Sequence, residues 1–159
     1  MGAKRTPKSP RRGTAPKRPT PKPKTSRPRK TLESIQPDQV SLVSTKGTRD
    51  RGGGLGGHAW RIEVDGKRAG VVFINWIDEA PVGEHASIQI YLNEVSQGRQ
   101  IGPVAYRQAC KASNYDVIYA HMRKSNVASR RAAEKVGFKE DNRLGHSQLL
   151  MVWQRDSNL

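Results

Sequence analysis

A short glycine-containing stretch offers residue types that can hold phosphate. Residues 97–102 read Gln-Gly-Arg-Gln-Ile-Gly and stand directly before a helical pattern. Backbone N–H groups at a helix N-terminus carry partial positive charge, and glycines let a ligand approach them closely. We therefore predict a phosphate-binding turn, to which Arg99 adds direct charge pairing. An ordinary glycine-containing turn is the alternative. The predicted turn consists of Gln97, Gly98, Arg99, Gln100, Ile101 and Gly102.

A second stretch has the residue types that begin and end a short helix. Residues 126–138 read Asn-Val-Ala-Ser-Arg-Arg-Ala-Ala-Glu-Lys-Val-Gly-Phe. Ser125 is predicted to cap this helix, and Gly137 fits the left-handed conformation in which helices commonly end. Residues 103–125 separate the two stretches, which leaves room for one helix and one strand. The spacing therefore predicts the order helix, strand, helix.

Several side chains outside these stretches could carry protons. His121 stands at the end of the predicted strand 116–122, on the same face as Tyr119. An ordinary imidazole titrates near neutral pH, which suits a general base. Glu84 and His85, at the entrance to the preceding strand, form a second candidate pair. The competing interpretations are a packed, hydrogen-bonded His121 and a solvated loop for the second pair.

Together the two stretches resemble the GCN5-related N-acetyltransferase (GNAT) superfamily. Its pyrophosphate signature, Arg/Gln-x-x-Gly-x-Gly/Ala, aligns with residues 97–102, although Gln100 stands where the middle glycine is usual. Its second motif has an Asn, a small residue three positions later and a Gly-Phe at the helix end. Asn126, Ser129 and Gly137-Phe138 match that motif. The resemblance covers about residues 59–154 and implies that the protein binds acetyl-CoA.

The resemblance also assigns expected roles around the coenzyme. The backbone of Ile90, Tyr91 and Leu92 would pair with the pantetheine arm like a short added strand. Asn126 and Ser129 would line the coenzyme cleft. The resemblance implies acetyl-CoA as the cosubstrate. No metal is predicted.

Catalytic roles follow less directly from the resemblance. His121 occupies the offset at which a Glu acts as base in the branch that acetylates ribosomal protein N-termini. The usual acid of the family, a Tyr seven residues after the Asn, is replaced here by Ala133. Tyr119, Tyr91 or solvent would then supply the proton, or catalysis would depend on positioning alone. Glu84 remains a second candidate for proton transfer.

Hydrophobic periodicity places these residues on a mixed α/β fold. The order of elements predicts a GNAT-like mixed central sheet with helices packed on it. The predicted strands are residues 40–43, 59–64, 68–77, 86–92, 116–122 and 149–153, and the predicted helices are residues 102–113 and 125–136.

The interval between the first two strands departs from the superfamily. Two helices usually stand there, whereas residues 46–57 are rich in Gly, Arg and Asp, with five glycines among residues 52–57. We therefore predict a flexible loop and a shortened N-terminal helical region. The acceptor site would then be open, or another chain would complete it.

The first 30 residues differ in composition from the rest of the chain. They hold twelve Lys or Arg, no Asp or Glu, and seven of the ten prolines. Such a segment cannot bury enough apolar surface to fold, so residues 1–30 are predicted to be a disordered basic tail. Residues 31–159, with 17 basic and 14 acidic side chains, are predicted to form one GNAT-like domain. The tail is expected to bind nucleic acid or the ribosome through counterion release, or only to aid solubility.

These observations predict an acetyl-CoA-dependent N-acetyltransferase whose acceptor is a basic protein or an amine on a modified nucleobase. A phage-type acyltransferase that modifies DNA bases is one alternative. A non-catalytic nucleic-acid-binding protein on the same scaffold is another, favoured by Gln100 and Ala133. The lone Cys110 cannot form an internal disulfide, which favours a reducing, cytoplasmic setting. No apolar run approaches the ~18 residues of a membrane span.

Overall fold

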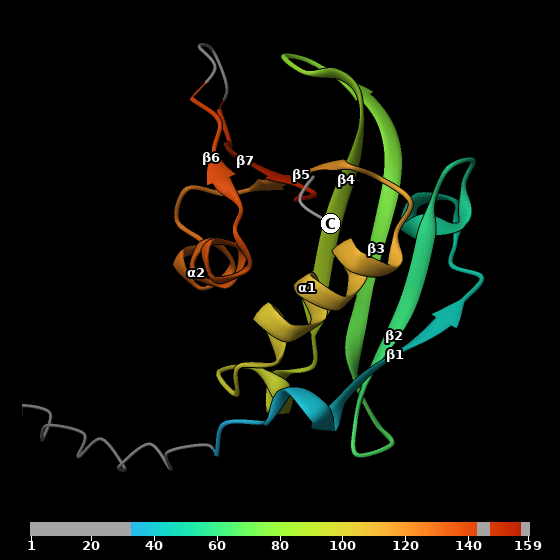
Figure 1. Ribbon diagram of the computed structural model, residues 1–159, viewed down its shortest axis with the longest axis vertical. Helices are drawn as coiled ribbons and strands as arrows, with labels where there is room; N and C mark the ends of the chain where they lie inside the picture. The colour runs from blue at the N-terminus through green and yellow to red at the C-terminus, as the bar shows by residue number, and fades with distance from the viewer. Residues whose placement is uncertain (1–32, 143–146, 157–159) are drawn as a thin grey trace, which may run out of the picture. The chain divides into compact units, whose positions relative to one another are not determined.

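The described part of the chain folds around one mixed sheet. The computed structural model describes residues 33–142 and 147–156, so the predicted tail of residues 1–30 lies outside it. The sheet has seven strands in the order β1-β2-β3-β4-β5-β7-β6 (Figure 1). The strands are β1 Val40–Thr45, β2 His58–Val64, β3 Lys67–Glu79, β4 Gly83–Leu92, β5 Val117–Met122, β6 Lys139–Glu140 and β7 Leu149–Gln154. The helices are α1 Ile101–Ala112 and α2 Val127–Val136, with short helical turns η1 Pro37–Gln39, η2 Arg49–Gly53 and η3 Glu94–Ser96. The predicted mixed α/β fold is therefore confirmed.

The parallel pair β4–β5 is the centre of the fold. The other strand pairs among the described residues are antiparallel. β4 and β5 pair only at Ala86 with Ile118 and at Ser87 with Tyr119. Beyond these two positions the strands separate, although β4 continues to Leu92 and β5 to Met122. The sheet therefore has an opening between its two central strands.

One face of the sheet is covered by α1. Figure 1 shows α1 lying across β3 and β4, with α2 beside it, and α1 also contacts β1. Alternate residues of the strands point to this face, among them the fully buried Ile74, Ile88 and Ile118. Ala105 and Ala109 of α1 are fully buried against them, so small side chains let the helix approach the sheet closely.

The opposite face carries the glycine-rich segment between β1 and β2. The backbone N–H of Gly52 donates to Asn75 Oδ1 at 2.7 Å, and Asn75 Nδ2 donates to the carbonyl of Asp50 at 2.8 Å. Asn75 neighbours the inward-facing Ile74 on β3, so its side chain points away from α1. The Arg51 guanidinium lies 5.3 Å from the centre of the Tyr91 ring on the same face. The predicted flexible loop is therefore a compact turn, with Gly52 buried.

The structure differs from the expected elements at three places. Residues 78–84, predicted as a loop, largely extend β3 and β4 as a hairpin, with Asp78 opposite Glu84. The two-residue β6 was not predicted. Asn126, rather than Ser125, caps α2, since its Oδ1 accepts from the Ser129 N–H at 3.2 Å. No helix in the described residues is long and apolar enough to cross a membrane.

Candidate active site

A groove runs between α1, α2 and the edge of β4. Its volume is about 580 Å³. All the residues predicted to bind the coenzyme line it except Arg99. Two stretches separated by more than twenty residues in the chain are therefore brought to one surface, because α1 and α2 pack side by side.

The N-terminus of α1 opens onto this groove. Gly98 and Gln100 both have positive φ angles, of 72° and 63°, and the helix begins at Ile101. The Gln100 side chain makes no capping hydrogen bond at this end, and the first N–H groups of a helix have no partner within the helix. A Cβ atom on the buried Gly102 would lie 3.6 Å from the Ala132 Cβ, which shows how closely α1 and α2 approach here. The turn therefore has the geometry of an anion cradle.

The positive charge of the groove comes from α2 rather than from the predicted arginine. Arg99 Nε lies 3.5 Å from the carbonyl oxygen of Glu33, so its side chain extends toward the N-terminal segment. Arg131 and Lys135 line the groove instead, and Lys135 Nζ donates to Gln100 Oε1 at 2.6 Å. The sequence contained a signal for these two cations, because their spacing of four residues places them on one helix face. Two cations beside a helix N-terminus suit a ligand with several phosphates.

The remaining predicted coenzyme contacts come from α2 and β4. Asn126 and Ser129 line the groove at the N-terminus of α2. The side-chain oxygen of Asn126 also accepts the hydrogen bond that caps the helix. Ile90, Tyr91 and Leu92 line the groove from the part of β4 that has separated from β5. A linear ligand arm could therefore run along this edge toward the opening in the sheet.

The candidate proton carriers gather near the last paired residues of β4 and β5. His85 Nε2 lies 2.8 Å from His121 Nε2, and the two ring planes differ by 24° with 5.1 Å between the ring centres, so the rings meet edge to edge. The Tyr119 ring meets the His85 ring edge-on at the same centre-to-centre distance. His85 and Tyr119 are buried, and His121 is half-buried. His85, from β4, thus contacts both Tyr119 and His121 of β5.

Glu84 is not part of this group. It is exposed, and it neighbours the buried His85 on β4, so the two side chains point to opposite faces of the strand. The pairing of Glu84 with His85 that the sequence suggested therefore does not form. His85 instead pairs with His121, 36 residues away in the chain.

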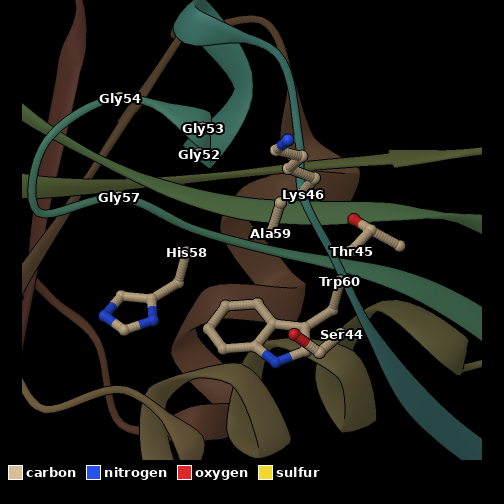
Figure 2. A pocket seen from close by; sticks show the side chains of 10 residues that line it. All are labelled: Ser44, Thr45, Lys46, Gly52, Gly53, Gly54, Gly57, His58, Ala59 and Trp60. Carbon is tan, nitrogen blue, oxygen red and sulfur yellow. The ribbon is translucent and has the colours of Figure 1, made fainter.

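A smaller cavity of about 250 Å³ lies beside the glycine-rich turn and shares no lining residue with the groove. Figure 2 shows the rings of His58 and Trp60 side by side at one wall and the glycine backbone at the other. These two rings are stacked, with 5.6 Å between their centres. The cavity reflects how the turn folds back over β2.

The sequence matches the family described as the acetyltransferase (GNAT) domain over residues 21–139, which is more than half of the chain. The chain therefore belongs to the GNAT acetyltransferase family. None of the curated proteins matches the sequence.

Solved structures of acetyltransferases share the fold. RimJ from Mycobacterium smegmatis, in complex with CoA-disulfide, is 23% identical, with a TM-score of 0.50 over 62% of this chain and 53% of RimJ. Salmonella typhimurium yncA, solved with acetyl-CoA, is 18% identical, with a TM-score of 0.51 over 65% of this chain and 67% of yncA. Spermidine N-acetyltransferase from Vibrio cholerae, in complex with CoA and spermine, is 18% identical, with a TM-score of 0.55 over 74% of this chain and 96% of that enzyme. The chain thus spans only about half of the length of RimJ.

Proposed function

We propose that this protein is an N-acetyltransferase that uses acetyl-CoA. The observation that carries the proposal is the groove, in which an uncapped helix N-terminus, two cations and an unpaired strand edge lie together. Membership of the GNAT family and the coenzymes named for RimJ and yncA support it. When bound, acetyl-CoA would supply its acetyl group: the C–S bond of the thioester breaks as the amide C–N bond forms, the amine loses a proton, and the CoA thiolate gains one to leave as the free thiol.

Each part of the groove has a role in holding the coenzyme. The turn at residues 97–102 receives the pyrophosphate at its backbone N–H groups. Arg131 and Lys135 neutralise phosphate charge from the facing helix. The β4 edge at residues 90–92 holds the pantetheine arm, and Ser129 and Asn126 line the cleft at the start of α2. This arrangement directs the reactive end of the coenzyme toward the opening between β4 and β5.

His121 is the base of this proposal, and Tyr119 is the acid. His121 is held by His85 next to the opening, and Tyr119 belongs to the last residue pair before the strands separate. Ala133, which stands where the family has its usual acid, is fully buried in the core. Ala133 cannot donate a proton, so the donor of this proposal is Tyr119, with Tyr91 and solvent as the alternatives, unless catalysis depends on positioning alone.

The acceptor is proposed to be an amine on a protein or on a modified nucleobase. Residues 1–30 would bring the enzyme to nucleic acid or to the ribosome through their twelve cations. Similar folds belong to a spermidine acetyltransferase and to an enzyme named for ribosomal L7/L12. A non-catalytic nucleic-acid-binding protein is the second candidate, favoured by the loss of the usual acid at Ala133.

The test of the proposed function is a calorimetric titration of acetyl-CoA into the full chain and two variants. Gly102→Ala places a Cβ at van der Waals distance from Ala132 and should bind like the wild type. Gly102→Arg places a long side chain between α1 and α2 and should abolish binding. Circular dichroism checks that both variants fold. Absence of binding to the wild type at millimolar acetyl-CoA would reject the enzyme in favour of the nucleic-acid-binding protein.

Turnover separates the roles of the proposed site residues. Acetyl transfer to candidate acceptors is followed by mass spectrometry for the wild type, Asn126→Ala and His121→Ala. Loss of a general base lowers a rate by about a hundredfold or more. If both variants turn over like the wild type, the site assignment is wrong even though the class of enzyme holds.

A further inference from the structure

The tautomer of His85 is set by a backbone carbonyl. His85 Nδ1 lies 2.6 Å from the carbonyl oxygen of Gly83. A carbonyl oxygen only accepts hydrogen bonds, so His85 Nδ1 must carry the hydrogen. In the neutral ring, His85 Nε2 then carries the lone pair. His85 is 4% exposed, so neighbouring groups rather than water must satisfy its nitrogens.

The same reasoning extends to His121. His121 Nε2 lies 2.8 Å from His85 Nε2, which carries the lone pair, so in the neutral pair His121 donates the hydrogen. The lone pair of His121 is then on Nδ1. His121 Nδ1 is shielded from solvent. One chain of hydrogen bonds thus runs from His121 through His85 to the Gly83 carbonyl.

We propose that His85 is a positioning residue that fixes the tautomer and ring orientation of His121. This inference rests on the proposed function, in which His121 is the base. A proton taken up at His121 Nδ1 leaves the hydrogen bond from His121 Nε2 to His85 intact, so the ring charges without turning. In the sheet, Ile77 on β3 is the partner of His85, and Leu150 on β7 is the partner of His121. His85 and the Gly83 carbonyl therefore orient His121 as a buried carboxylate orients the histidine of a serine protease, but without the carboxylate's negative charge.

The experiment is nitrogen NMR of the imidazoles in the full chain. The four histidines are assigned with single His→Gln variants. We expect His85 in the form with hydrogen on Nδ1, and a scalar coupling between the two Nε2 nuclei across their hydrogen bond. His121→Gln should abolish this coupling. His58→Gln is the matched control, since His58 stacks on Trp60 outside the pair, and it should leave the coupling unchanged.

Two variants of His85 separate positioning from packing. His85→Gln keeps an acceptor oxygen for the His121 Nε2–H, so the His121 ring nitrogens should keep nearly their wild-type shifts. His85→Leu keeps the bulk without the acceptor, so those shifts should move toward the average of the two tautomers. The proposal is overturned if His85 carries its hydrogen on Nε2, if no coupling is seen, or if both variants give the same His121 spectrum. Acetyl-CoA titration of the same samples reports separately whether the proposed function itself fails.

Discussion

Lys135 Nζ donates a 2.6 Å hydrogen bond to Gln100 Oε1, which joins the last turn of α2 to the residue before α1. Both residues line the groove. Gln100 has φ 63° and ψ 21°, a left-handed conformation in which glycine is the usual residue. Gln100 therefore adopts the left-handed conformation that glycine favours. The Gln100 side chain holds the Lys135 ammonium beside the N-terminus of α1.

The left-handed conformation of Gln100 predicts how substitutions there affect stability. Gln100→Gly should change the free energy of unfolding by less than about 1 kcal/mol, because relief of strain and the greater flexibility of unfolded glycine oppose each other. Gln100→Val should destabilise by about 1–2 kcal/mol, because a β-branched residue fits this conformation poorly. Urea unfolding measures both. Equal effects of the two substitutions would contradict the left-handed assignment.

The cations of α2 are expected to contribute to coenzyme affinity. Lys135→Ala and Arg131→Ala should each weaken acetyl-CoA binding by about threefold to tenfold at low salt, and by less at high salt, because exposed charges are screened. Lys111→Ala removes a cation from the last turn of α1 that does not line the groove, and it serves as the control. Calorimetry at two ionic strengths measures the effect. An equal loss of affinity in the control would mean that the net charge of the protein, and not the position of the two cations, causes the effect.

Asn126 has a capping role that must be separated from any contact with the coenzyme. Asn126→Ala removes the acceptor for the Ser129 N–H and should cost about 1 kcal/mol of stability. Asn126→Ser retains a capping oxygen and should be close to the wild type in stability. If Asn126 also contacts acetyl-CoA, the serine variant binds the coenzyme more weakly although it is stable. Unchanged affinity in both variants would leave Asn126 as a helix cap only.

The glycine-rich turn should tolerate little change at Gly52. Its φ is 80°, and a Cβ atom there would lie 2.2 Å from the carbonyl oxygen of His58. Gly52→Ala is therefore expected to destabilise by more than about 2 kcal/mol, from steric overlap added to backbone strain. Gly66→Ala is the matched control, since Gly66 has φ 77° with no atom within 4 Å of the added Cβ. It should cost only about 1 kcal/mol. Thermal unfolding compares the two, and equal losses would show that the turn is not closely packed.

Cys110 and Tyr106 predict a loss of stability at alkaline pH. Burial raises the pKa of Cys110 to about 12, with Arg155 opposing the shift, and burial also raises the pKa of Tyr106. Both side chains are neutral in the folded protein. Their contribution to the free energy of unfolding is therefore complete below the pKa values that they have in the unfolded chain. It is lost as the pH rises toward the higher pKa values that they have in the folded protein. Stability should therefore fall above about pH 8.5, where an unfolded thiol begins to ionise.

Urea unfolding of the wild type and Cys110→Ala from about pH 7 to about pH 10 checks this expectation. The variant should be less stable at neutral pH, because it leaves a small cavity, but its stability should fall less steeply. The native thiol should also resist thiol reagents until the protein unfolds. Parallel pH dependences of the two proteins would contradict the prediction.

The periodicity of the sequence was sufficient for most of the fold. The six predicted strands and both helices form, because alternation and the 3.6-residue repeat report directly which face of an element is buried. The glycine-rich segment was misjudged as flexible. Its glycines permit a tight turn that Asn75 holds from a distant strand, and a local reading of composition cannot detect such a partner. The extended hairpin at residues 78–84 depends on cross-strand pairing in the same way.

The sequence alone determined the chemistry that the groove residues could offer, because the glycines, the helix start at residue 101 and the Asn-to-Gly helix are local patterns. Only the tertiary structure decided which side chains face one another. Arg99 extends to the N-terminal segment, while Arg131 and Lys135 line the groove that forms where α1 and α2 pack together. His85 meets His121 across two neighbouring strands, a contact between residues 36 positions apart that no local pattern encodes.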